Sequence, residues 1–384
     1  MQAISSSRVL GPDGRIAPAT LSWDGASIVH VGERAVALGA LDARDMLVLP
    51  GMVDLHGDAF ERQVMPRPGV AFDMEVALAE TDRQLIANGI TTAFHAVTFS
   101  FEPGLRGANA VREFMAGMSR LRRSLACDTR IHLRHEAYNV DAIDEIVGWI
   151  AAGDVDLLAF NDHTPPLVEK ARAGKSLQRY VERTGLDPVE FAALILSVGD
   201  RAGDVPGANA RLAEAARRAG IPMASHDDET PEMRAAFRAL GVAICEFPKT
   251  RATAAAARAF NEASVLGAPN VVRGGSQSGA IDAVPAIEAG LCDVLASDYY
   301  YPAMLLAPFR LAAGSGIGFA RCWDLVSANP AAAAGLRDRG SLVAGRRADI
   351  LVVDDRDPRS PRLAAVIAGG RPAMVDLSLV RARA

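Results

Sequence analysis

The stretch LVLPGMVDLHGDAFERQVMPRP, residues Leu47–Pro68, is the part of the chain from which the fold is most readily inferred. It begins with a run of Leu, Val and Met around Pro50-Gly51, a pattern typical of a strand buried on both faces. Alternation then places four side chains on one face of the strand: Met52, Asp54, His56 and Asp58. Imidazole and carboxylate are both ligands for zinc- or manganese-type ions. A single His-x-Asp is weak evidence, so the metal hypothesis depends on the other strands.

Composition narrows the class of protein. The chain has 384 residues, 50% of them hydrophobic, which is enough for one large barrel and a small second domain. A net charge of −5 gives no basic surface for nucleic acid or anionic lipid, so we expect neither as a partner. Four widely spaced cysteines without a CxxC pair, no signal-peptide pattern and no apolar run of membrane-spanning length predict a cytoplasmic protein.

Both ends of the chain are rich in strand signals. Ala19–Trp23 and Ser27–Val31 flank the turn Asp24-Gly25, which predicts a hairpin. Near the other end, Ala348–Val353 and Ala364–Ala368 are strand-like and are followed by Gly369-Gly370. We therefore predict a small β-sandwich domain made from residues 1–50 and 336–384, with residues 51–335 forming a separate domain between them.

The middle of the chain alternates between strand-like and helical segments. After the strand of the opening stretch, the predicted strands are Gly89–Val97, Arg130–Glu136, Asp156–His163, Ile221–His226, Val242–Phe247, Ser264–Val272 and Asp293–Asp298. The predicted helices include Leu105–Leu125, Asp141–Ile150 and Ile281–Ala289. Eight such units predict an α/β fold, a (β/α)₈ TIM-type barrel. The alternative, an open doubly wound sheet, is disfavoured because no Gly-rich dinucleotide turn follows the first strand.

In a barrel of this type the chemistry lies at the carboxyl ends of the strands. Five of the predicted strands end in side chains that could bind a metal: His56 with Asp58, Glu136, His163, His226 and Asp298. Polar residues are common at strand ends, but so many ligand types together predict a metal centre at the barrel mouth.

The chain also resembles a known family. It is similar to the amidohydrolase superfamily, and more narrowly to the branch that acts on α-D-ribose 1-methylphosphonate 5-triphosphate in the carbon–phosphorus lyase pathway. The segments that carry the resemblance are LPGMVDLHGD, GITT, IHLRHE, NDHTP, ASHDDET, EFPKT, LGAPNVVRGGSQSG, LASDYYYPAML and RGSLVAGRRADI. The resemblance implies the barrel and a small sheet from both termini. It also implies a His-x-Asp pair on strand one, a bridging carboxylate, two more histidines and an aspartate on strand eight.

The resemblance further implies a pair of divalent ions, with zinc expected and manganese or iron as alternatives. His56, Asp58 and Asp298 would bind one ion and His163 and His226 the other, with Glu136 shared between them. Asp298 would also take a proton from water. Four further polar residues are interpreted as positioning groups or barrel structure: His132, Asp162, Asp227 and Asp228.

Three residues depart from the pattern of the relatives. Gln277 stands where a histidine is expected and His95 where an acid is expected, so a proton donor at position 277 is in doubt. His135 replaces a small residue and, by alternation, should point out of the barrel in a structural role.

The loop after the seventh strand suggests a phosphate site. Glycines allow backbone N–H groups to converge on an anion, and an arginine adds a charged fork. The predicted phosphate-binding residues in this loop are Arg273, Gly274, Gly275 and Ser276. Arg134 and Lys249 should supply more positive charge, and alternation places Arg134 on the inward face of its strand with His132 and Glu136. The alternative interpretation of the Gly-Gly pair is a tight turn.

These observations predict a metal-dependent hydrolase that cleaves the phosphoanhydride of a ribosyl 5-triphosphate, with pyrophosphate as the leaving group. The partner is thus a phosphorylated sugar, while the oligomeric state stays open, a homo-oligomer included. Two alternatives remain. The same metal set would serve a C–N hydrolase such as a cyclic amidase or deaminase, and a scaffold subunit without activity would need no metal.

Overall fold

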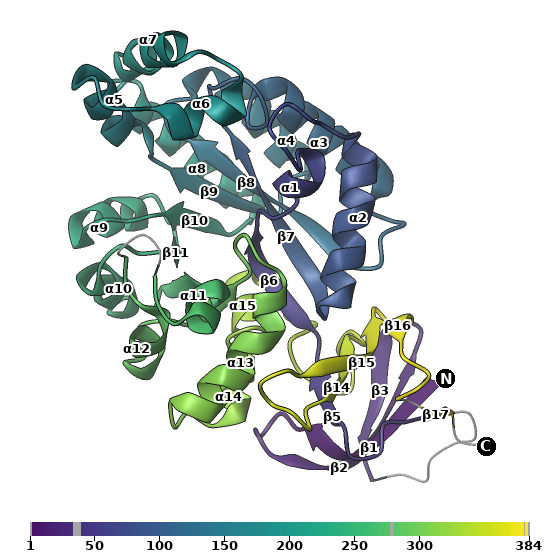
Figure 1. Ribbon diagram of the computed structural model, residues 1–384. Coiled ribbons are helices and arrows are strands. Elements are labelled where there is room, and N and C mark those ends of the chain that lie inside the picture. The colour runs from purple at the N-terminus through teal and green to yellow at the C-terminus, as the bar shows by residue number, and fades with distance from the viewer. Residues whose placement is uncertain (1, 34–39, 277–279, 380, 383–384) are drawn as a thin grey trace.

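The computed structural model describes residues 2–33, 40–276, 280–379 and 381–382. They form two sheets, one of which is surrounded by helices (Figure 1). Gln277, whose identity departs from the expected histidine, lies outside the described residues. Among the helices of the described residues, none has both the length and the apolar character required to cross a bilayer.

The larger sheet is a parallel barrel. Its eight strands neighbour one another in chain order. They are β6 (Met52–Gly57), β7 (Ile90–Phe99), β8 (Asp128–Glu136), β9 (Leu157–Asn161), β10 (Met223–His226), β11 (Ile244–Glu246), β12 (Ala263–Gly267) and β13 (Val294–Ala296). A parallel bridge between Gly57 and Asp298 brings the two edges together. The predicted (β/α)₈ barrel is confirmed, because a doubly wound sheet would reverse its strand order at a switch point.

Helices cover the outside of the barrel (Figure 1). They are α1 (Glu61–Val64), α2 (Met74–Ala87), α3 (Ala108–Leu121), α4 (Ile143–Ala152), α5 (Thr164–Arg172), α6 (Gln178–Thr184), α7 (Pro188–Gly199), α8 (Val205–Ala219), α9 (Pro231–Ala239), α10 (Arg251–Arg258), α11 (Ala268–Arg273), α12 (Ala283–Glu288), α13 (Pro302–Gly314), α14 (Phe319–Asp324) and α15 (Ala328–Ala333). A short 3₁₀ turn, Val140–Ala142, precedes α4. Local signals explain several starts: the side chains of Asp73, Thr230 and Thr250 accept hydrogen bonds from first-turn N–H groups of α2, α9 and α10.

The second sheet is built from both ends of the chain, as predicted. Its strands are β1 (Gln2–Leu10), β2 (Ile16–Asp24), β3 (Ser27–Gly32), β4 (Leu41–Asp42), β5 (Leu47–Pro50), β14 (Ile350–Asp354), β15 (Arg362–Ala368), β16 (Arg371–Val375) and β17 (Arg381–Ala382). The main path runs β16-β15-β14-β5-β1-β2-β3, so β5 and β14 join the two chain ends at its centre. The sheet lies to one side of the barrel (Figure 1).

The opening stretch is divided between the two sheets. Leu47–Pro50 pairs antiparallel with β14, with Leu49 opposite Leu351. Met52–Gly57 instead begins the barrel and pairs with β7. The change of sheet occurs at Gly51, where a Cβ atom would collide with the side chain of Thr91. The apolar run is therefore two short buried strands, separated by a glycine at a point where the side chains of Thr91 and Asp349 leave no room for a Cβ atom.

The seventh strand is shorter than predicted. We expected a strand over Ser264–Val272, but β12 ends at Gly267 and α11 begins at Ala268. Pro269 stands in the first turn of α11, where its fixed φ and missing N–H are tolerated. The apolar residues after Gly267 therefore continue as a buried helix, because periodicity alone does not separate a short buried strand from a helical turn.

Candidate functional site

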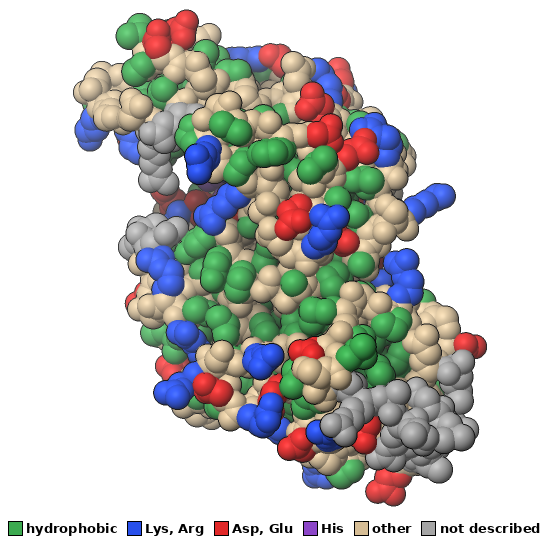
Figure 2. Space-filling view, turned by 45° about the vertical axis from the view of Figure 1, so that its right-hand side comes forward, with side chains coloured by type: hydrophobic (Ala, Val, Ile, Leu, Met, Phe, Trp, Pro, Cys, Tyr) green, Lys and Arg blue, Asp and Glu red, His purple; other side chains and the backbone are tan. Residues whose placement is uncertain are grey.

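Two adjoining compartments lie at the carboxyl ends of the barrel strands. The larger has a volume of about 640 Å³ and extends toward α5 and α6. The smaller, about 260 Å³, lies toward α11 and the end of β13. Four side chains line both compartments: Arg134, His226, Asp227 and Lys249. Figure 2 shows a hollow at the left edge of the molecule with acidic and basic side chains inside it.

Strands β6 and β13 hold the predicted ligands His56, Asp58 and Asp298 close together. The backbone N–H of Asp298 donates to the carbonyl of His56 at 2.8 Å, and that of Asp58 donates to the carbonyl of Asp298 at 3.0 Å. Asp54, two residues before His56 on the same strand, accepts from the backbone N–H of Ser297 at 2.9 Å and from its hydroxyl at 2.5 Å. Asp54 thus braces the first strand against the eighth, while all three predicted ligands line the smaller compartment.

Strained backbone marks the ends of three site strands. Asp227, Phe247 and Asp298 have φ values of 62°, 52° and 55°, in the left-handed region that side chains other than glycine rarely adopt. Each residue follows shortly after the last residue of β10, β11 or β13. Such residues cost about 1–3 kcal/mol each and concentrate at functional sites.

His163, His226 and Asp227 form one potential metal-binding cluster, with ligand atoms within 4.8 Å of one another. The Nε2 atom of His163 lies 3.5 Å from Asp227, and its Nδ1 atom lies 3.2 Å from Glu136. Burial alone would lower the pKa of His163, but hydrogen bonds with Asp227 and Glu136 outweigh it and raise the pKa to about 9. Glu136 also accepts from the backbone N–H of His163 and from the hydroxyl of Thr164.

Glu246 is a site residue that we did not predict. It ends β11, is fully buried, and forms a second potential metal-binding cluster with His56 and His226. One of its carboxylate oxygens lies 3.0 Å from Nδ1 of His56 and 3.5 Å from Nδ1 of His226. The signal was present in the sequence, because the sixth strand ends Ile244-Cys245-Glu246 and so has a polar terminus like the other five site strands.

Arg134 and Lys249 bring positive charge to the shared wall of the compartments. Arg134 faces inward as alternation predicted, and its guanidinium donates to Nε2 of His226 at 2.9 Å. Its other nitrogen lies 3.8 Å from Asp58. The ammonium group of Lys249 lies 2.7 Å from Asp227. Both cations are therefore placed among carboxylates and imidazoles rather than directed away from the cavity.

The strand-seven loop has a different geometry from the one we expected. Arg273 is an exposed residue of α11 that bonds to the hydroxyl of Tyr299, and it is not among the described residues that line either compartment. The N–H groups of Gly274 and Gly275 both donate to the carbonyl of Asn270. Ser276 lines the smaller compartment, although its N–H donates to Asp282. These backbone contacts are those of a helix-ending turn.

The donor set suits a divalent cation. Asp58, Asp227 and Asp298 line the smaller compartment, and Arg134 and Lys249 are the Lys or Arg side chains opposed to them among its described lining residues. Burial, followed by the charge of Asp58, raises the pKa of Asp298 to about 7. Clustered imidazole nitrogens and an excess of carboxylates are the ligands that zinc- and manganese-type ions take.

The remaining predicted polar residues differ in their surroundings. His132 is buried, and its Nδ1 donates to the carbonyl of Leu55 at 2.9 Å. Asp162 lines the larger compartment, and burial raises its pKa to about 6. His135 is fully buried, and His95 packs edge-on against Phe60 within a hydrophobic cluster.

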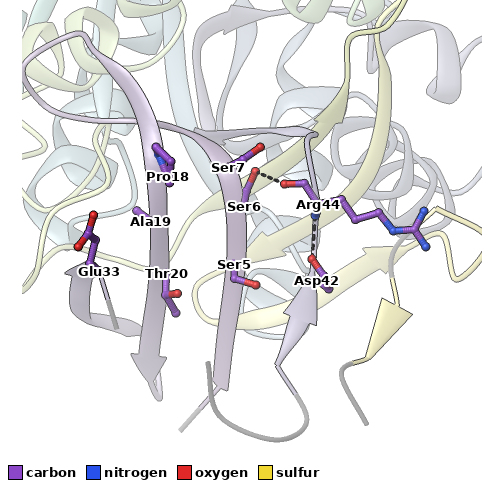
Figure 3. A pocket seen from close by; sticks show the side chains of 9 residues that line it. All are labelled: Ser5, Ser6, Ser7, Pro18, Ala19, Thr20, Glu33, Asp42 and Arg44. Carbon is purple, nitrogen blue, oxygen red and sulfur yellow. Dashed lines mark hydrogen bonds between the residues drawn. The ribbon is translucent and has the colours of Figure 1, made fainter. Parts of the chain in front are cut away.

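A cavity of about 530 Å³ lies on the second sheet, which is built from both ends of the chain. It is lined by Ser5 to Ser7 of β1, by β2 and by the segment around Asp42 (Figure 3). The hydroxyl of Ser6 donates to the carbonyl of Arg44 there, and the N–H of Arg44 donates to Asp42. Neither metal-binding cluster of the described residues includes any of these groups. The barrel mouth is therefore the better candidate for chemistry.

Comparison with known proteins finds a matching family profile and several similar proteins. The amidohydrolase family profile matches residues 182–382. Alpha-D-ribose 1-methylphosphonate 5-triphosphate diphosphatase of Escherichia coli (strain K12) is 32% identical over 326 residues, which cover 83% of this chain and 86% of that enzyme. Adenine deaminase of Methylobacterium sp. (strain 4-46) is 43% identical over 77 residues, 20% of this chain and 13% of that one. The crystal structure of N-isopropylammelide isopropylaminohydrolase from Burkholderia multivorans ATCC 17616 superposes with a TM-score of 0.64 at 19% identity, covering 97% of this chain and 98% of that chain.

Proposed function

We propose that this chain, which belongs to the amidohydrolase family, is a metal-dependent hydrolase that cleaves the phosphoanhydride of a ribosyl 5-triphosphate. The substrate is α-D-ribose 1-methylphosphonate 5-triphosphate, and the products are the 5-phosphate and pyrophosphate. One observation carries the proposal: His56, His163 and His226 line the same two adjoining compartments as the cations Arg134 and Lys249. The identity to the Escherichia coli diphosphatase over most of both chains supports the choice of substrate.

The proposed metal ligands are those expected from the sequence. His56, Asp58 and Asp298 would hold one ion, His163 and His226 would hold the second, and Glu136 would be a ligand to both. The backbone bonds between Asp58 and Asp298 support the first group, and the contact between Glu136 and His163 supports the second. Zinc is the expected ion, with manganese or iron as alternatives. A divalent cation bound there supplies positive charge that polarises a phosphoryl oxygen.

The protein's own side chains then bind the triphosphate and move the proton. Arg134 and Lys249 donate to phosphate oxygens as negative charge moves onto the leaving pyrophosphate. Asp298 takes a proton from the attacking water, a role that suits a carboxylate whose pKa is raised to about 7 by burial and by Asp58. Arg273, Gly274, Gly275 and Ser276 stay predicted phosphate contacts, and the position of Ser276 at the smaller compartment supports its inclusion.

A C–N hydrolase is the second candidate. The local match to an adenine deaminase favours it, and so does the occurrence of an aminohydrolase with the same fold. A neutral ring or amide would need the metal centre but would give Arg134 and Lys249 no anionic partner. Because of these two cations, we rank the C–N hydrolase below the phosphoanhydride hydrolase.

The deciding experiment is a substrate panel on one preparation whose metal content has been measured. The protein, loaded with zinc or manganese, should contain about two divalent ions per chain, as binuclear hydrolases do. It should release pyrophosphate from the ribosyl 5-triphosphate, but neither ammonia from adenine nor ring-opened products from cyclic amides. Ammonia release or ring opening without pyrophosphate release would favour the C–N hydrolase, and a preparation that binds no divalent ion would remove the metal mechanism.

A further inference from the structure

Glu246 is not among the described residues that line either compartment, yet it contacts two histidines of the candidate metal centre. The carboxylate is fully buried at the end of β11, and one oxygen faces Nδ1 of both His56 and His226. Its other oxygen has no hydrogen-bond partner among the described residues. A buried carboxylate in such surroundings is costly, and this argues for a specific role.

The protonation of His226 follows from its two neighbours. Arg134 donates to Nε2 at 2.9 Å, and a guanidinium has donors only, so Nε2 must be the unprotonated, accepting nitrogen. The proton of the neutral ring is then on Nδ1, which faces Glu246 at 3.5 Å. Glu246 accepts this proton's hydrogen bond, and the lone pair of Nε2, which accepts from Arg134, faces the compartments that both residues line.

The ring of His56 lies in the same relation to the carboxylate. Its Nδ1 atom is 3.0 Å from the same oxygen of Glu246, and its ring stacks on that of His226 with a centroid separation of 5.2 Å. The carboxylate has acceptors but no donor when ionised, so the bond requires the Nδ1–H form of His56 as well. One acid thus selects the same tautomer in two stacked rings.

His132 is a third imidazole near this carboxylate, but it is held differently. Its Nδ1 donates to the carbonyl of Leu55, and its Nε2 lies 3.7 Å from Glu246. That distance is too long for a direct hydrogen bond, and His132 lines neither compartment among the described lining residues. The short contacts of Glu246 are therefore those with the two histidines proposed to bind metal.

We infer that Glu246 is a positioning residue that holds His56 and His226 in the Nδ1–H form and presents both Nε2 atoms to the metal centre. The inference rests on the proposed function only in naming a metal as the ligand. Metal-binding histidines generally donate their second ring nitrogen to a carboxylate or carbonyl, which fixes ring orientation and raises basicity. Here one carboxylate on strand six serves ligands from strands one and five.

Two measurements test the inference on the full-length protein. The chain has seven histidines, so ¹⁵N-histidine labelling gives a spectrum that can be assigned with single variants. In the metal-free wild type, His56 and His226 should both be Nδ1–H tautomers. Glu246→Gln should change the tautomer of His56, since Arg134 still donates to Nε2 of His226. Calorimetric titration of chelator-treated protein with zinc should show affinity lowered about 10–100-fold in Glu246→Gln.

A matched control separates positioning from general destabilisation. Glu262 is another buried barrel carboxylate, but it pairs with Arg234 and Arg238 rather than with histidine. Glu262→Gln should lower the unfolding midpoint and leave zinc affinity and histidine tautomers unchanged. Equal zinc affinity and unchanged tautomers in Glu246→Gln would overturn the inference.

The zinc-loaded wild type gives a further test. Loss of the Nδ1 protons from His56 and His226 on loading would mean that Glu246 shares a metal with them directly, which also overturns the positioning role. A wild type that binds no zinc but keeps both Nδ1–H tautomers would instead refute the metal mechanism of the proposed function.

Discussion

Replacing Arg234 should destabilise the barrel more than any surface arginine, because its side chain is fully buried among acids and carbonyls. The guanidinium donates to Ser225 at 2.5 Å, to Asp228 at 3.2 Å and to the carbonyl of Val242 at 2.6 Å, and it lies 2.9 Å from Glu262. These contacts tie together the ends of β10 and β11, the strands that carry His226 and Glu246.

The expected loss of unfolding free energy follows from the charged groups that lose their partner when Arg234 is replaced. In Arg234→Met, Glu262 keeps its ion pair with Arg238, but Asp228 loses its only cation within ion-pair distance among the described residues. One oxygen of Asp228 already lacks a hydrogen-bond partner there. Removing one partner of a buried ion pair costs about 3–5 kcal/mol, and because Met refills the apolar volume we expect a loss of about 3 kcal/mol.

Urea unfolding followed by circular dichroism at pH 7.5 measures this loss. Arg234→Met should unfold at clearly lower urea than wild type, and Arg234→Met combined with Asp228→Asn should recover part of the difference, since the stranded charge is removed as well. A single variant within about 1 kcal/mol of wild type, or a double variant less stable than the single, would refute the assignment of the loss to an unpaired buried charge.

Two further predictions concern charge at the site and acid stability. Lys249→Ala should reduce kcat/KM for pyrophosphate release by about a hundredfold or more, as removal of a donor to a transition-state oxyanion does. Arg273→Ala should reduce kcat/KM by less, because the side chain of Arg273 is exposed. A larger reduction of kcat/KM in Arg273→Ala than in Lys249→Ala would show that the phosphates bind at the strand-seven loop. Burial lowers the pKa of His95 and of His135 from 6.5 to about 4, so each contributes stability that is complete above pH 6.5 and is lost as the pH falls toward 4. At pH 5 the loss is about 2 kcal/mol per histidine. His95→Leu should therefore lose less stability than wild type between pH 7.5 and pH 5 in urea titrations, and parallel losses would contradict the buried, neutral state of His95.

Much of the architecture could be predicted because each strand carries its own evidence. The alternation of apolar strands and amphipathic helices indicates the barrel without knowledge of any contact, and the hairpins at both ends indicate the second sheet. The predicted inward direction of Arg134 is confirmed by its contact with His226, because alternation along a strand is a local property. The boundary at Gly267 was missed, since apolar residues satisfy a buried strand and a buried helix turn equally well.

The candidate site was harder to predict because its contacts join distant parts of the chain. His56 and Glu246 are 190 positions apart, and no local pattern states which strand ends face each other or at what height in the barrel. The same limit applies to Arg273: its neighbours in sequence suggested an anion site, but helix α11 carries its side chain to the exposed surface.

By itself, the sequence determined which side chains end the barrel strands, because strand periodicity and the carboxyl-end rule depend only on local order. The tertiary structure alone decided which of them meet. The convergence of Glu246 with His56 and His226 depends on strand stagger and barrel closure, which arise from backbone hydrogen bonds between strands encoded far apart. Those bonds set the heights and directions of the strand ends, and with them the geometry in which imidazole, carboxylate and guanidinium come within bonding distance.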